Sequence, residues 1–446
     1  MSQSSPRVSF TTLGCRLNQA ETDSMAEELA EHGVQASTSD ADPDVVVINT
    51  CTVTREATKA SRQAIRRAAK KHPDAKVVVI GCYAVSDPDE VASIEGVDLV
   101  LTNDDKERFG EVLGSHSATA PLLTIGGPRL RAEKPVERVR ANLKAQTGCD
   151  EWCTFCIIPK TRGPLRSLVE DDLIAEARAR VSAGAREIVL TGMHLGKYTY
   201  DAGGDERDLV RLFERLLGID GLRRLRLSSI LSRHLTPEVV DFIASEPRMC
   251  RHLHVPLQSG DDGVLAAMNR PYRIAEYLES IERVKTHIPL VALATDIIVG
   301  FPGESEDAFA ATMEVVRRVE FSKLHVFRYS ERPGTAAAGM EDVVAPEIKK
   351  DRSKRLIALG NDIRGRFLAE HLNRPLHVLV EDERQVDDVS ICSGQTDDYV
   401  RVWFEGSDLL GEVVGVDGVR VRADGVEGRL LSQQDAVLVS AGPREL

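Results

Sequence analysis

Three cysteines within eight residues constrain this chain more than any other feature of its sequence. They are Cys149, Cys153 and Cys156, in the spacing Cys-x3-Cys-x2-Cys, and no fourth cysteine or histidine lies close by in the sequence. A structural zinc site needs four ligands, usually from paired Cys-x2-Cys motifs, and a thioredoxin-like motif needs only two cysteines. Three thiolates on one short loop suit a 4Fe–4S cluster with one iron left free of protein ligands.

The free iron of such a cluster is available to a substrate or cofactor. The loop closely resembles that of radical S-adenosylmethionine (SAM) enzymes, for which this spacing is the signature, and the resemblance implies that SAM binds there. The alternative is that the three cysteines lie close together by chance. We predict a cluster at Cys149, Cys153 and Cys156.

The bulk composition is that of an ordinary globular protein. At 446 residues, 42% of them apolar and 28% charged, the chain has room for two or three domains with their own cores. No apolar run approaches the roughly 20 residues of a membrane span, and the N-terminus lacks the apolar segment of a secretory signal. We therefore expect a cytoplasmic protein with no membrane partner, in which eight cysteines serve metal binding rather than disulfides. Because the net charge is −13, any contact with RNA must depend on local basic patches.

The first predicted domain covers residues 1–125. Apolar, β-prone runs at residues 8–13, 45–48 and 77–80 alternate with amphipathic helical stretches. Unbroken β-branched strands that alternate with helices indicate a parallel sheet buried on both faces. In such sheets the C-terminal ends of the strands share one edge, where ligands bind.

A cysteine follows each of these three runs. Cys15, Cys51 and Cys82 should therefore converge on one edge of the sheet, although 36 and 31 positions separate them. The alternative is three ordinary buried cysteines, which are common. We predict a second 4Fe–4S cluster held by these three thiolates.

The helical stretch after Cys51 is strongly basic. A charged helix face is often only a solvated surface, but this one begins beside a predicted cluster, so we also consider a role in binding phosphate. Its basic residues are Arg55, Lys59, Arg62, Arg66, Arg67, Lys70 and Lys71. Residues 115–137, with three prolines, are predicted to be a linker.

The second predicted domain covers residues 138–370 and repeats a strand–helix pattern. Six strand-like runs, at residues 142–147, 187–190, 224–227, 252–257, 292–299 and 324–327, fit a partial TIM-like (β/α)6 barrel. Such barrels carry their active sites at the C-terminal ends of the strands, and the Cys149–Cys156 loop follows the first strand.

Polar and glycine-containing turns follow the later strands at the same predicted rim. Each is compatible with ordinary turn chemistry, but together they suit a SAM site to which we assign Gly192, Ser229 and Gln258, with Phe155 offering its backbone to the adenine. We assign structural roles to the histidines, because radical hydrogen abstraction needs no protein base, and we predict no catalytic side chain. Lys160, Arg162 and Arg166 follow the cysteine loop and are candidates to contact a phosphate backbone.

The third predicted domain covers residues 371–440, where the pattern changes to alternation. Five short antiparallel strands, at residues 376–380, 399–404, 410–414, 418–422 and 436–439, indicate a small β-barrel of a kind that often binds RNA. Residues 371–446 contain 15 acidic and 7 basic residues, so shape and a few arginines would have to hold any RNA. Cys250 and Cys392 have no partners in the pattern.

Taken together, these motifs resemble the methylthiotransferase family, over nearly the whole chain. That family joins an N-terminal three-cysteine domain, a radical SAM barrel and a C-terminal TRAM module. Residues 13–21, 329–335 and 394–399 are most similar to the MtaB type, which acts on N6-threonylcarbamoyladenosine in tRNA. Further matching segments are residues 49–53, 81–83, 149–156, 254–260, 268–272 and 295–304.

The resemblance implies a reaction, cofactors and partners. SAM at the Cys149–Cys156 cluster would yield a radical that removes hydrogen from C2 of the base, and a cluster on Cys15, Cys51 and Cys82 would deliver the methylthio group. The expected cofactors are two 4Fe–4S clusters and SAM. The expected partners are the anticodon stem-loop of tRNA, modified at position 37, an electron donor such as flavodoxin or ferredoxin, and a sulfur source.

Other functions stay open at this point. The same chemistry could act on isopentenyladenosine in tRNA (MiaB type) or on an aspartate of a ribosomal protein (RimO type). The second cluster could serve electron transfer alone, or the chain could be a non-catalytic iron–sulfur protein that binds RNA.

Overall fold

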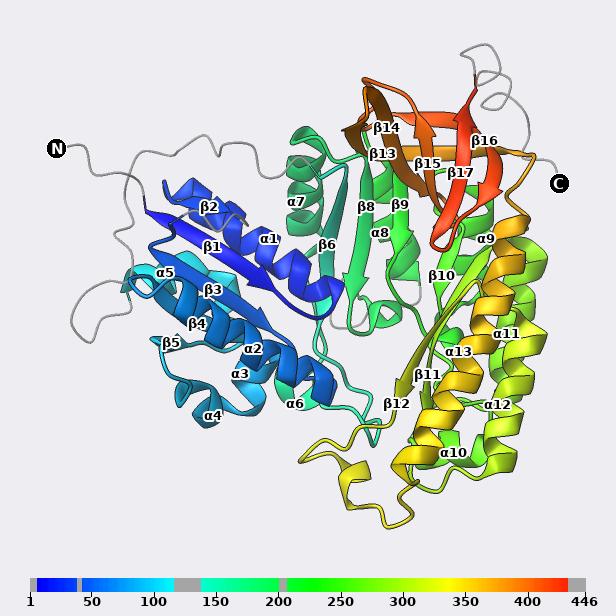
Figure 1. Cartoon of the computed structure of the whole chain (residues 1–446), viewed down its shortest axis with the longest axis horizontal. Coiled ribbons are helices and arrows are strands. Elements are labelled where there is room, and N and C mark those ends of the chain that lie inside the picture. Colours follow the sequence, from blue (N-terminus) through cyan, green and yellow to red (C-terminus); the bar gives the residue numbers. More distant parts are fainter. Residues whose placement is uncertain (1–5, 38–41, 116–137, 200–206, 432–446) are drawn as a thin grey trace.

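The computed structural model describes residues 6–37, 42–115, 138–199 and 207–431. The predicted linker at residues 115–137 lies outside these ranges except for residue 115, which ends a helix. The boundary at residue 125 and the predicted strand at residues 436–439 also lie outside them. Figure 1 shows an N-terminal sheet with its helices, a central curved sheet, and a small β-barrel at the C-terminal end of the described chain. The predicted α/β architecture is confirmed.

The N-terminal sheet is entirely parallel, in the order β2-β1-β3-β4-β5. The three predicted strands are β1 (Arg7–Thr12), β3 (Val45–Thr50) and β4 (Lys76–Gly81). Two short strands that were not predicted, β2 (Gln35–Ser37) and β5 (Leu99–Val100), close the edges.

Helices cover both faces of this sheet. Apolar residues of α1 (Arg16–Glu31) and α5 (Phe109–Ser115) pack on one face, and those of α2 (Arg55–Lys71) and α4 (Pro88–Ala92) pack on the other. Because both faces are buried, every residue of β3 is buried. The remaining elements are α3 (Cys82–Ser86) and the 3-10 turn η1 (Asp104–Arg108).

The central barrel contains the six predicted parallel strands. They form two sheets, β7-β6-β8-β9 and β10-β11-β12, which an isolated bridge between Leu225 and Met249 connects. The six are β6 (Arg140–Thr147), β8 (Glu187–Gly192), β9 (Arg224–Leu227), β10 (His252–His254), β11 (Ala292–Val299) and β12 (Lys323–Arg328), and β7 (Arg166–Ser167) pairs antiparallel with β6.

Helices surround the outer face of the barrel, and their apolar side chains pack with those of the strands in one large core. They are α7 (Glu170–Ser182), α8 (Arg207–Leu217), α9 (Pro237–Ser245), α11 (Ile274–His287) and α12 (Glu306–Val319). Helix α1 of the N-terminal domain lies beside β6 (Figure 1), where Ser24 accepts a hydrogen bond from Arg180 (3.1 Å). Shorter elements are α6 (Ile158–Arg162), α10 (Asp262–Ala267) and the turns η2 (Leu195–Lys197), η3 (Ser232–His234) and η4 (Ala336–Gly339).

The long helix α13 (Pro346–Ala369) leads to the C-terminal barrel, which is closed in the order β13-β14-β15-β17-β16. Its pairs are antiparallel except for β15 with β17, which is parallel. The predicted strand boundaries are partly wrong here, because residues 410–414 and 418–422 belong largely to one strand and two strands were not predicted. The strands are β13 (Pro375–Val386), β14 (Val389–Thr396), β15 (Arg401–Glu405), β16 (Val413–Val421) and β17 (Gly425–Leu430).

This C-terminal barrel docks at the amino ends of the central strands. Arg224, the first residue of β9, donates to the carbonyl oxygens of Gln395 and His377, both at 2.8 Å. Arg140, the first residue of β6, donates to the hydroxyl of Tyr399 at 3.0 Å. The C-terminal barrel therefore lies at the end of the central barrel opposite to the Cys149–Cys156 loop. In the part of the chain that the structure describes, we find no helix with the length and apolarity needed to cross a membrane.

Candidate active site

The Cys149–Cys156 loop begins directly after β6, at the C-terminal rim of the barrel. Gly148 makes the exit possible, since its φ is +69° and a Cβ there would lie 1.8 Å from the carbonyl oxygen of Pro164. Burial, with a smaller contribution from the charges of Cys153 and Cys149, raises the pKa of the Cys156 thiol to about 12. Burial also raises the pKa of the Cys149 thiol. Iron binds cysteines as thiolates, so a metal cluster would stabilise the charged form that burial disfavours here.

The segment from Ala267 to Arg270 supports this loop. Thr154 donates to the carbonyl oxygens of Met268 (3.1 Å) and Ala267 (2.9 Å), and Asn269 Nδ2 donates to that of Trp152 (2.9 Å). Asn269 has a φ of +55°, in the left-handed region that asparagine tolerates better than most residues. Sequence reasoning recognised this segment only as a family motif and gave it no role.

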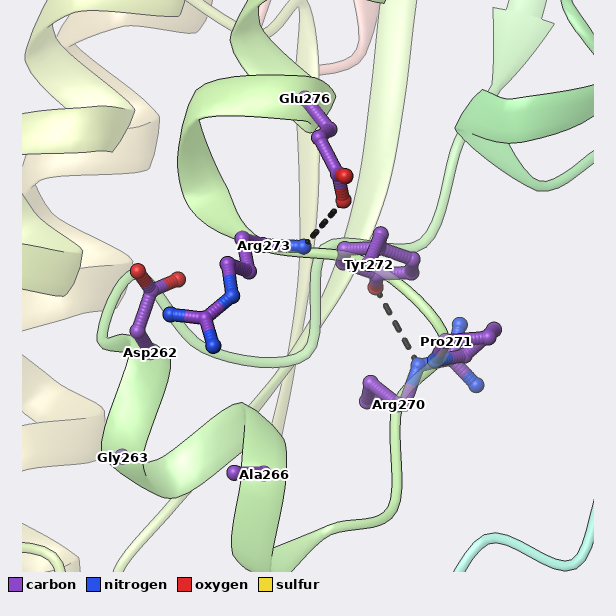
Figure 2. Close-up of a pocket in the computed structure, with 8 residues that line it drawn as sticks. All are labelled: Asp262, Gly263, Ala266, Arg270, Pro271, Tyr272, Arg273 and Glu276. Atoms are coloured by element: carbon purple, nitrogen blue, oxygen red, sulfur yellow. Dashed lines mark hydrogen bonds between the residues drawn. The ribbon is translucent and has the colours of Figure 1, made fainter.

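Arg270 contacts a predicted cluster ligand directly. Its Nη1 donates to Cys153 Sγ at 3.2 Å, and its Nε donates to the hydroxyl of Tyr272, also at 3.2 Å. Arg270 and Tyr272 also line a surface cavity of about 510 Å³, together with Asp262 and Glu276 (Figure 2). Arg270 therefore places a fixed positive charge on the sulfur of Cys153.

Charged residues hold the first half of the loop from its other side. Asp150 pairs with Lys197 at 2.7 Å, and Glu151 pairs with Arg233. His194 Nδ1 lies 3.4 Å from Asp150 Oδ1, and burial lowers the pKa of His194 to about 4, so its ring is neutral near pH 7. Lys197, Arg233 and His194 therefore hold the Cys149–Cys156 loop in position.

The four residues assigned to SAM lie at or near the same rim. Gly192 ends β8, Ser229 follows β9, and Gln258 follows β10, where a bridge joins it to Ile297 of β11. Ser229 Oγ lies 3.1 Å from His254 Nδ1, and His254 Nε2 lies 3.0 Å from Asp296 Oδ1.

Gln258 has the features of a ligand-binding residue. It is buried, its φ is +66°, and its Oε1 has no hydrogen-bond partner among the described residues. A buried polar atom without a partner is costly, and a bound polar cofactor would supply one. Phe155, from the cysteine loop, makes an edge contact with Phe301 at 6.4 Å between ring centroids. The residues present thus fit a polar cofactor beside the loop.

The N-terminal cysteines follow three neighbouring strand ends, as predicted. Cys51 follows β3 directly, Cys82 follows β4 directly, and Cys15 lies three residues after β1. Cys15 is exposed, whereas Cys51 and Cys82 are buried. A Cβ at Gly14, whose φ is +94°, would lie 2.9 Å from Cys51 Sγ, so only glycine lets the two cysteine loops approach this closely.

Asn18 ties these loops together. Its Nδ2 donates to the carbonyl oxygens of Leu13 (2.7 Å) and Thr50 (3.0 Å), which lie just before Cys15 and Cys51. Its Oδ1 accepts a hydrogen bond from Arg162, which follows the other cysteine loop. One buried side chain therefore connects both sets of cysteines. The sequence analysis included Asn18 only as part of the family motif at residues 13–21 and gave it no role.

The prediction that Arg162 contacts phosphate is wrong. Its side chain is fully buried, and Nη1 lies 2.7 Å from Glu21 Oε1 of α1. Arg166 is partly exposed but pairs with Glu107 at 2.6 Å, and Lys160 donates to the carbonyl oxygen of Gly334. These three basic residues join parts of the protein to one another.

Comparison with known proteins decides the family. Residues 7–102 match the family described as "Uncharacterized protein family UPF0004", and residues 143–316 match the "Radical SAM superfamily". The chain is 38% identical over 424 residues to "Threonylcarbamoyladenosine tRNA methylthiotransferase MtaB" of Bacillus subtilis (strain 168), a match that covers 92% of this chain and 93% of the relative. The chain belongs to the radical SAM methylthiotransferase family.

Other relatives include both tRNA-modifying types of this family. The MtaB protein of Aquifex aeolicus (strain VF5) is 35% identical, with coverage of 92% of this chain and 99% of the relative. A "tRNA-2-methylthio-N(6)-dimethylallyladenosine synthase" of Sorangium cellulosum (strain So ce56) is 34% identical, with coverage of 99% and 96%. Membership of a radical SAM family implies one 4Fe–4S cluster and SAM.

A solved structure agrees on the fold. The radical SAM methyltransferase TsrM from Kitasatospora setae, with tryptophan and a SAM analogue bound, covers 75% of this chain and is covered to 75%, with a TM-score of 0.56 and 15% identity.

The basic helix α2 of this methylthiotransferase lies at the junction of the N-terminal domain and the barrel rim. At its first residue, the backbone N–H of Arg55 donates to Ser330 Oγ (3.4 Å), and Arg332 Nη2 donates to Thr58 Oγ1 (3.1 Å). Lys59, Arg66 and further basic residues along the helix are exposed. A positively charged face therefore extends outward from the region that contains both sets of cysteines.

Proposed function

We propose that this enzyme adds a methylthio group to C2 of N6-threonylcarbamoyladenosine at position 37 of tRNA. The observation that carries the proposal is that two three-cysteine sets follow strand ends and are linked through Asn18 and Arg162, in a chain 38% identical over nearly its whole length to a relative with that name. The relative at 38% identity carries the threonylcarbamoyladenosine name, whereas dimethylallyladenosine synthases among the relatives are 32–35% identical, which favours this substrate.

The proposal assigns a role to each site. Cys149, Cys153 and Cys156 hold the cluster to which SAM binds, with Phe155, Gly192, Ser229 and Gln258 around SAM. Cluster and SAM together supply radical hydrogen abstraction from an inert C–H bond, which no side chain can provide. The chain's own residues position these groups: Arg270 faces the Cys153 sulfur, Gln258 offers an unpaired carbonyl, and Asn18 fixes the second set of cysteines.

A second 4Fe–4S cluster, on Cys15, Cys51 and Cys82, is part of the proposal as the place from which the methylthio group is delivered. The convergence of the three strand ends and the glycine at position 14 support it. We also propose the domain division 1–125, 138–370 and 371–440, a cytoplasmic location, and an electron donor such as flavodoxin or ferredoxin with a separate sulfur source.

The exposed basic residues of α2 support the anticodon stem-loop as the RNA partner. A phosphate backbone needs cations, which the acidic C-terminal barrel offers sparsely. Helix α2 offers them beside the cysteine sets, so the loop of the RNA could enter the site while its stem contacts this helix.

The test is mass spectrometry of nucleosides from tRNA of strains with and without the gene. We expect the 2-methylthio derivative of N6-threonylcarbamoyladenosine to disappear in the deletion strain and to return with the wild-type gene but not with a Cys153→Ser gene. If only the isopentenyl derivative disappears, the substrate is that of the dimethylallyladenosine synthases. If neither changes and a ribosomal aspartate loses its methylthio group, the substrate is a protein.

A further inference from the structure

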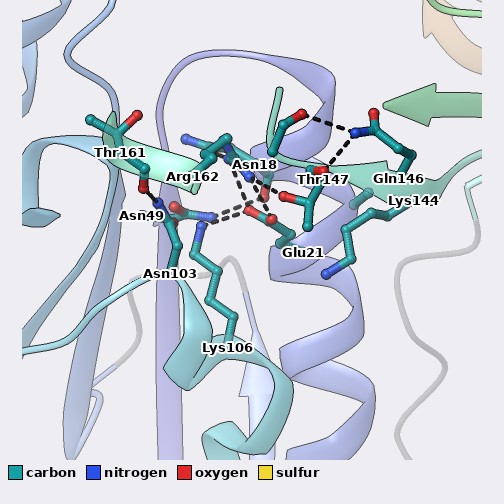
Figure 3. Close-up of polar contacts among 12 residues, drawn as sticks. Asn18, Glu21, Asn49, Asn103, Lys106, Lys144, Gln146, Thr147, Thr161 and Arg162 are labelled. Atoms are coloured by element: carbon teal, nitrogen blue, oxygen red, sulfur yellow. Dashed lines mark hydrogen bonds and ion pairs between the residues drawn. The ribbon is translucent and has the colours of Figure 1, made fainter. Parts of the chain in front are cut away.

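Three charged side chains are buried together where the N-terminal domain meets the barrel (Figure 3). Glu21 lies on α1, Lys106 on η1 and Arg162 at the end of α6, with exposed side-chain fractions of 3%, 1% and 0%. Lys106 Nζ lies 2.6 Å from Glu21 Oε2, and Arg162 Nη1 lies 2.7 Å from Glu21 Oε1. One carboxylate therefore pairs with two buried cations.

The charges of this group do not cancel. Among the described residues, no second carboxylate lies within ion-pair distance of Lys106 or Arg162. Arg162 keeps its charge at any pH, and the Glu21 carboxylate favours the charged form of Lys106 against the effect of burial, which lowers the pKa of Lys106. An excess positive charge that is removed from water is unfavourable unless a negative group lies nearby.

The N-terminal cysteines are the candidates for that negative group. Arg162 donates to Asn18, whose own Nδ2 holds the backbone just before Cys15 and Cys51. The charges of Cys82 and Cys15 raise the pKa of Arg162, after the opposing effect of burial and the larger contribution of Glu21. A thiolate-ligated iron–sulfur cluster is negative and becomes more so on reduction.

We propose that Glu21, Lys106 and Arg162 form a built-in counter-charge for an iron–sulfur cluster on Cys15, Cys51 and Cys82. The inference rests on the second cluster of the proposed function and adds the residues that set its reduction potential. Arg162 also fixes this cluster relative to the loop of the first one, because it follows Cys156 by six positions and lies at the end of the helix that leaves that loop. The three are positioning residues that act through the cluster.

The proposal predicts opposite effects for opposite charges. Reduction adds one electron to the cluster, so a nearby cation favours the reduced form and a nearby anion disfavours it. Replacing Lys106 with methionine should make the midpoint potential more negative, and replacing Glu21 with glutamine should make it more positive. We expect each shift to reach about a tenfold change in the reduction equilibrium, about 59 mV for a one-electron couple.

The experiment isolates the N-terminal cluster in the full-length chain. Cys149, Cys153 and Cys156 are replaced by alanine, the protein is reconstituted with iron and sulfide, and its midpoint potential is measured by EPR-monitored titration with dithionite. Lys106→Met and Glu21→Gln are compared in this background, together with the double variant, which keeps the net charge of the group. The matched control is Arg166→Gln, since Arg166 lies near Arg162 in sequence but pairs with Glu107 at the surface.

The proposal expects the two single variants to shift the potential in opposite directions and the double variant to stay near the parent. Shifts of the same sign, or none larger than that of Arg166→Gln, would overturn it. If a single variant binds little iron, the midpoint potential of the double variant is compared with that of the parent instead. A difference larger than the one that Arg166→Gln causes contradicts the proposal. If the parent itself binds no iron, the second cluster of the proposed function is wrong, which is a separate result.

Discussion

The two sets of cysteines are built in opposite ways. Cys149, Cys153 and Cys156 come from one loop of eight residues, whereas Cys15, Cys51 and Cys82 come from three strands that only the folded sheet brings together. The loop is supported by a distant segment, residues 267–270, and the strand ends are tied by Asn18. In the local set, Cys149, Cys153 and Cys156, the sequence fixes the spacing of the cysteines, and the fold only orients the loop. In the dispersed set, Cys15, Cys51 and Cys82, the distances between the cysteines depend on the folded sheet.

The largest expected effect separates the two sites by function. Cys153→Ser should abolish both reductive SAM cleavage and methylthiolation, because the cluster that binds SAM loses a ligand. Cys51→Ser should abolish methylthiolation but keep SAM cleavage within about threefold of wild type. Both are measured by chromatography of 5′-deoxyadenosine and of modified nucleosides after reaction with reduced enzyme.

Cys392→Ser is the control for this pair of variants. Cys392 is buried in the C-terminal barrel, where its Sγ donates to the carbonyl oxygen of Gly406 at 3.2 Å, a bond that serine can keep. Loss of SAM cleavage in Cys51→Ser would show that the two sites do not work as separate units, and full methylthiolation in that variant would remove the second cluster from the reaction.

The second prediction tests whether the site at Cys15, Cys51 and Cys82 depends on the hydrogen bonds of Asn18. Asn18→Ala leaves the carbonyl oxygens of Leu13 and Thr50 without this donor, and a buried polar group without a partner costs about 1–3 kcal/mol. We expect iron bound at the N-terminal site to fall by more than half, while iron at the Cys149–Cys156 loop is retained. Iron and sulfide are assayed in the full-length variant and again with Cys149, Cys153 and Cys156 replaced by alanine.

Gln19→Ala is the matched control, since Gln19 is the next residue of α1 and is exposed. An equal loss of iron from both sites in Asn18→Ala would mean that the substitution unfolds the junction of the two domains as a whole. Unchanged iron content would show that the sheet alone holds the three strand ends in place.

The same difference explains what the sequence could predict. Continuous β-branched runs identify β1, β3 and β4, and because parallel strands end on one edge, the placement of Cys15, Cys51 and Cys82 follows from topology. Short edge strands such as β2 and β5 carry no such run, since they bury few residues.

In the C-terminal barrel, β14 was missed because its sequence is polar and contains a glycine. Gly394 is required there, since a Cβ would lie 2.0 Å from the carbonyl oxygen of Leu379. Asp387 and Asp388, between β13 and β14, both have positive φ, the conformation of a two-residue hairpin turn. Because aspartate tolerates this conformation, the Asp-Asp pair was a usable sequence signal for the turn.

The supporting residues of the site were beyond sequence reasoning for a different reason. Glu21 belongs to the family motif at residues 13–21, but it lies 85 positions from Lys106 and 141 from Arg162, and nothing in the motif shows which residues it pairs with. Arg162 was instead grouped with its neighbours in sequence, and that placed it at the surface. Metal ligands that are close together in a short motif can be recognised in a sequence. Side chains that support them from another domain cannot, because their separation in the sequence follows no pattern.

The smallest expected effect concerns how the local site is tuned. Arg270 Nη1 donates to Cys153 Sγ at 3.2 Å, and a hydrogen bond from a charged group is worth about 1.5–3 kcal/mol. Arg270→Gln removes the charge and weakens the bond, so the reduced form of the cluster, which carries more negative charge, loses stabilisation. We expect a more negative midpoint potential and SAM cleavage slowed by about tenfold, with the iron content unchanged because all three cysteines remain.

Arg273→Gln is the control, because Arg273 lies three positions away, is exposed, and contributes its backbone N–H to Glu276 (2.8 Å). If Arg270→Gln lost iron instead of shifting the potential, Arg270 would be a structural support of the loop, like Asn18 at the other site. A shifted potential with full iron content would mean that Cys149, Cys153 and Cys156 hold the cluster without Arg270, and that Arg270 changes only the electrostatics at the cluster. Cys15, Cys51 and Cys82, by contrast, would depend on distant parts of the chain for their geometry as well as for their electrostatics.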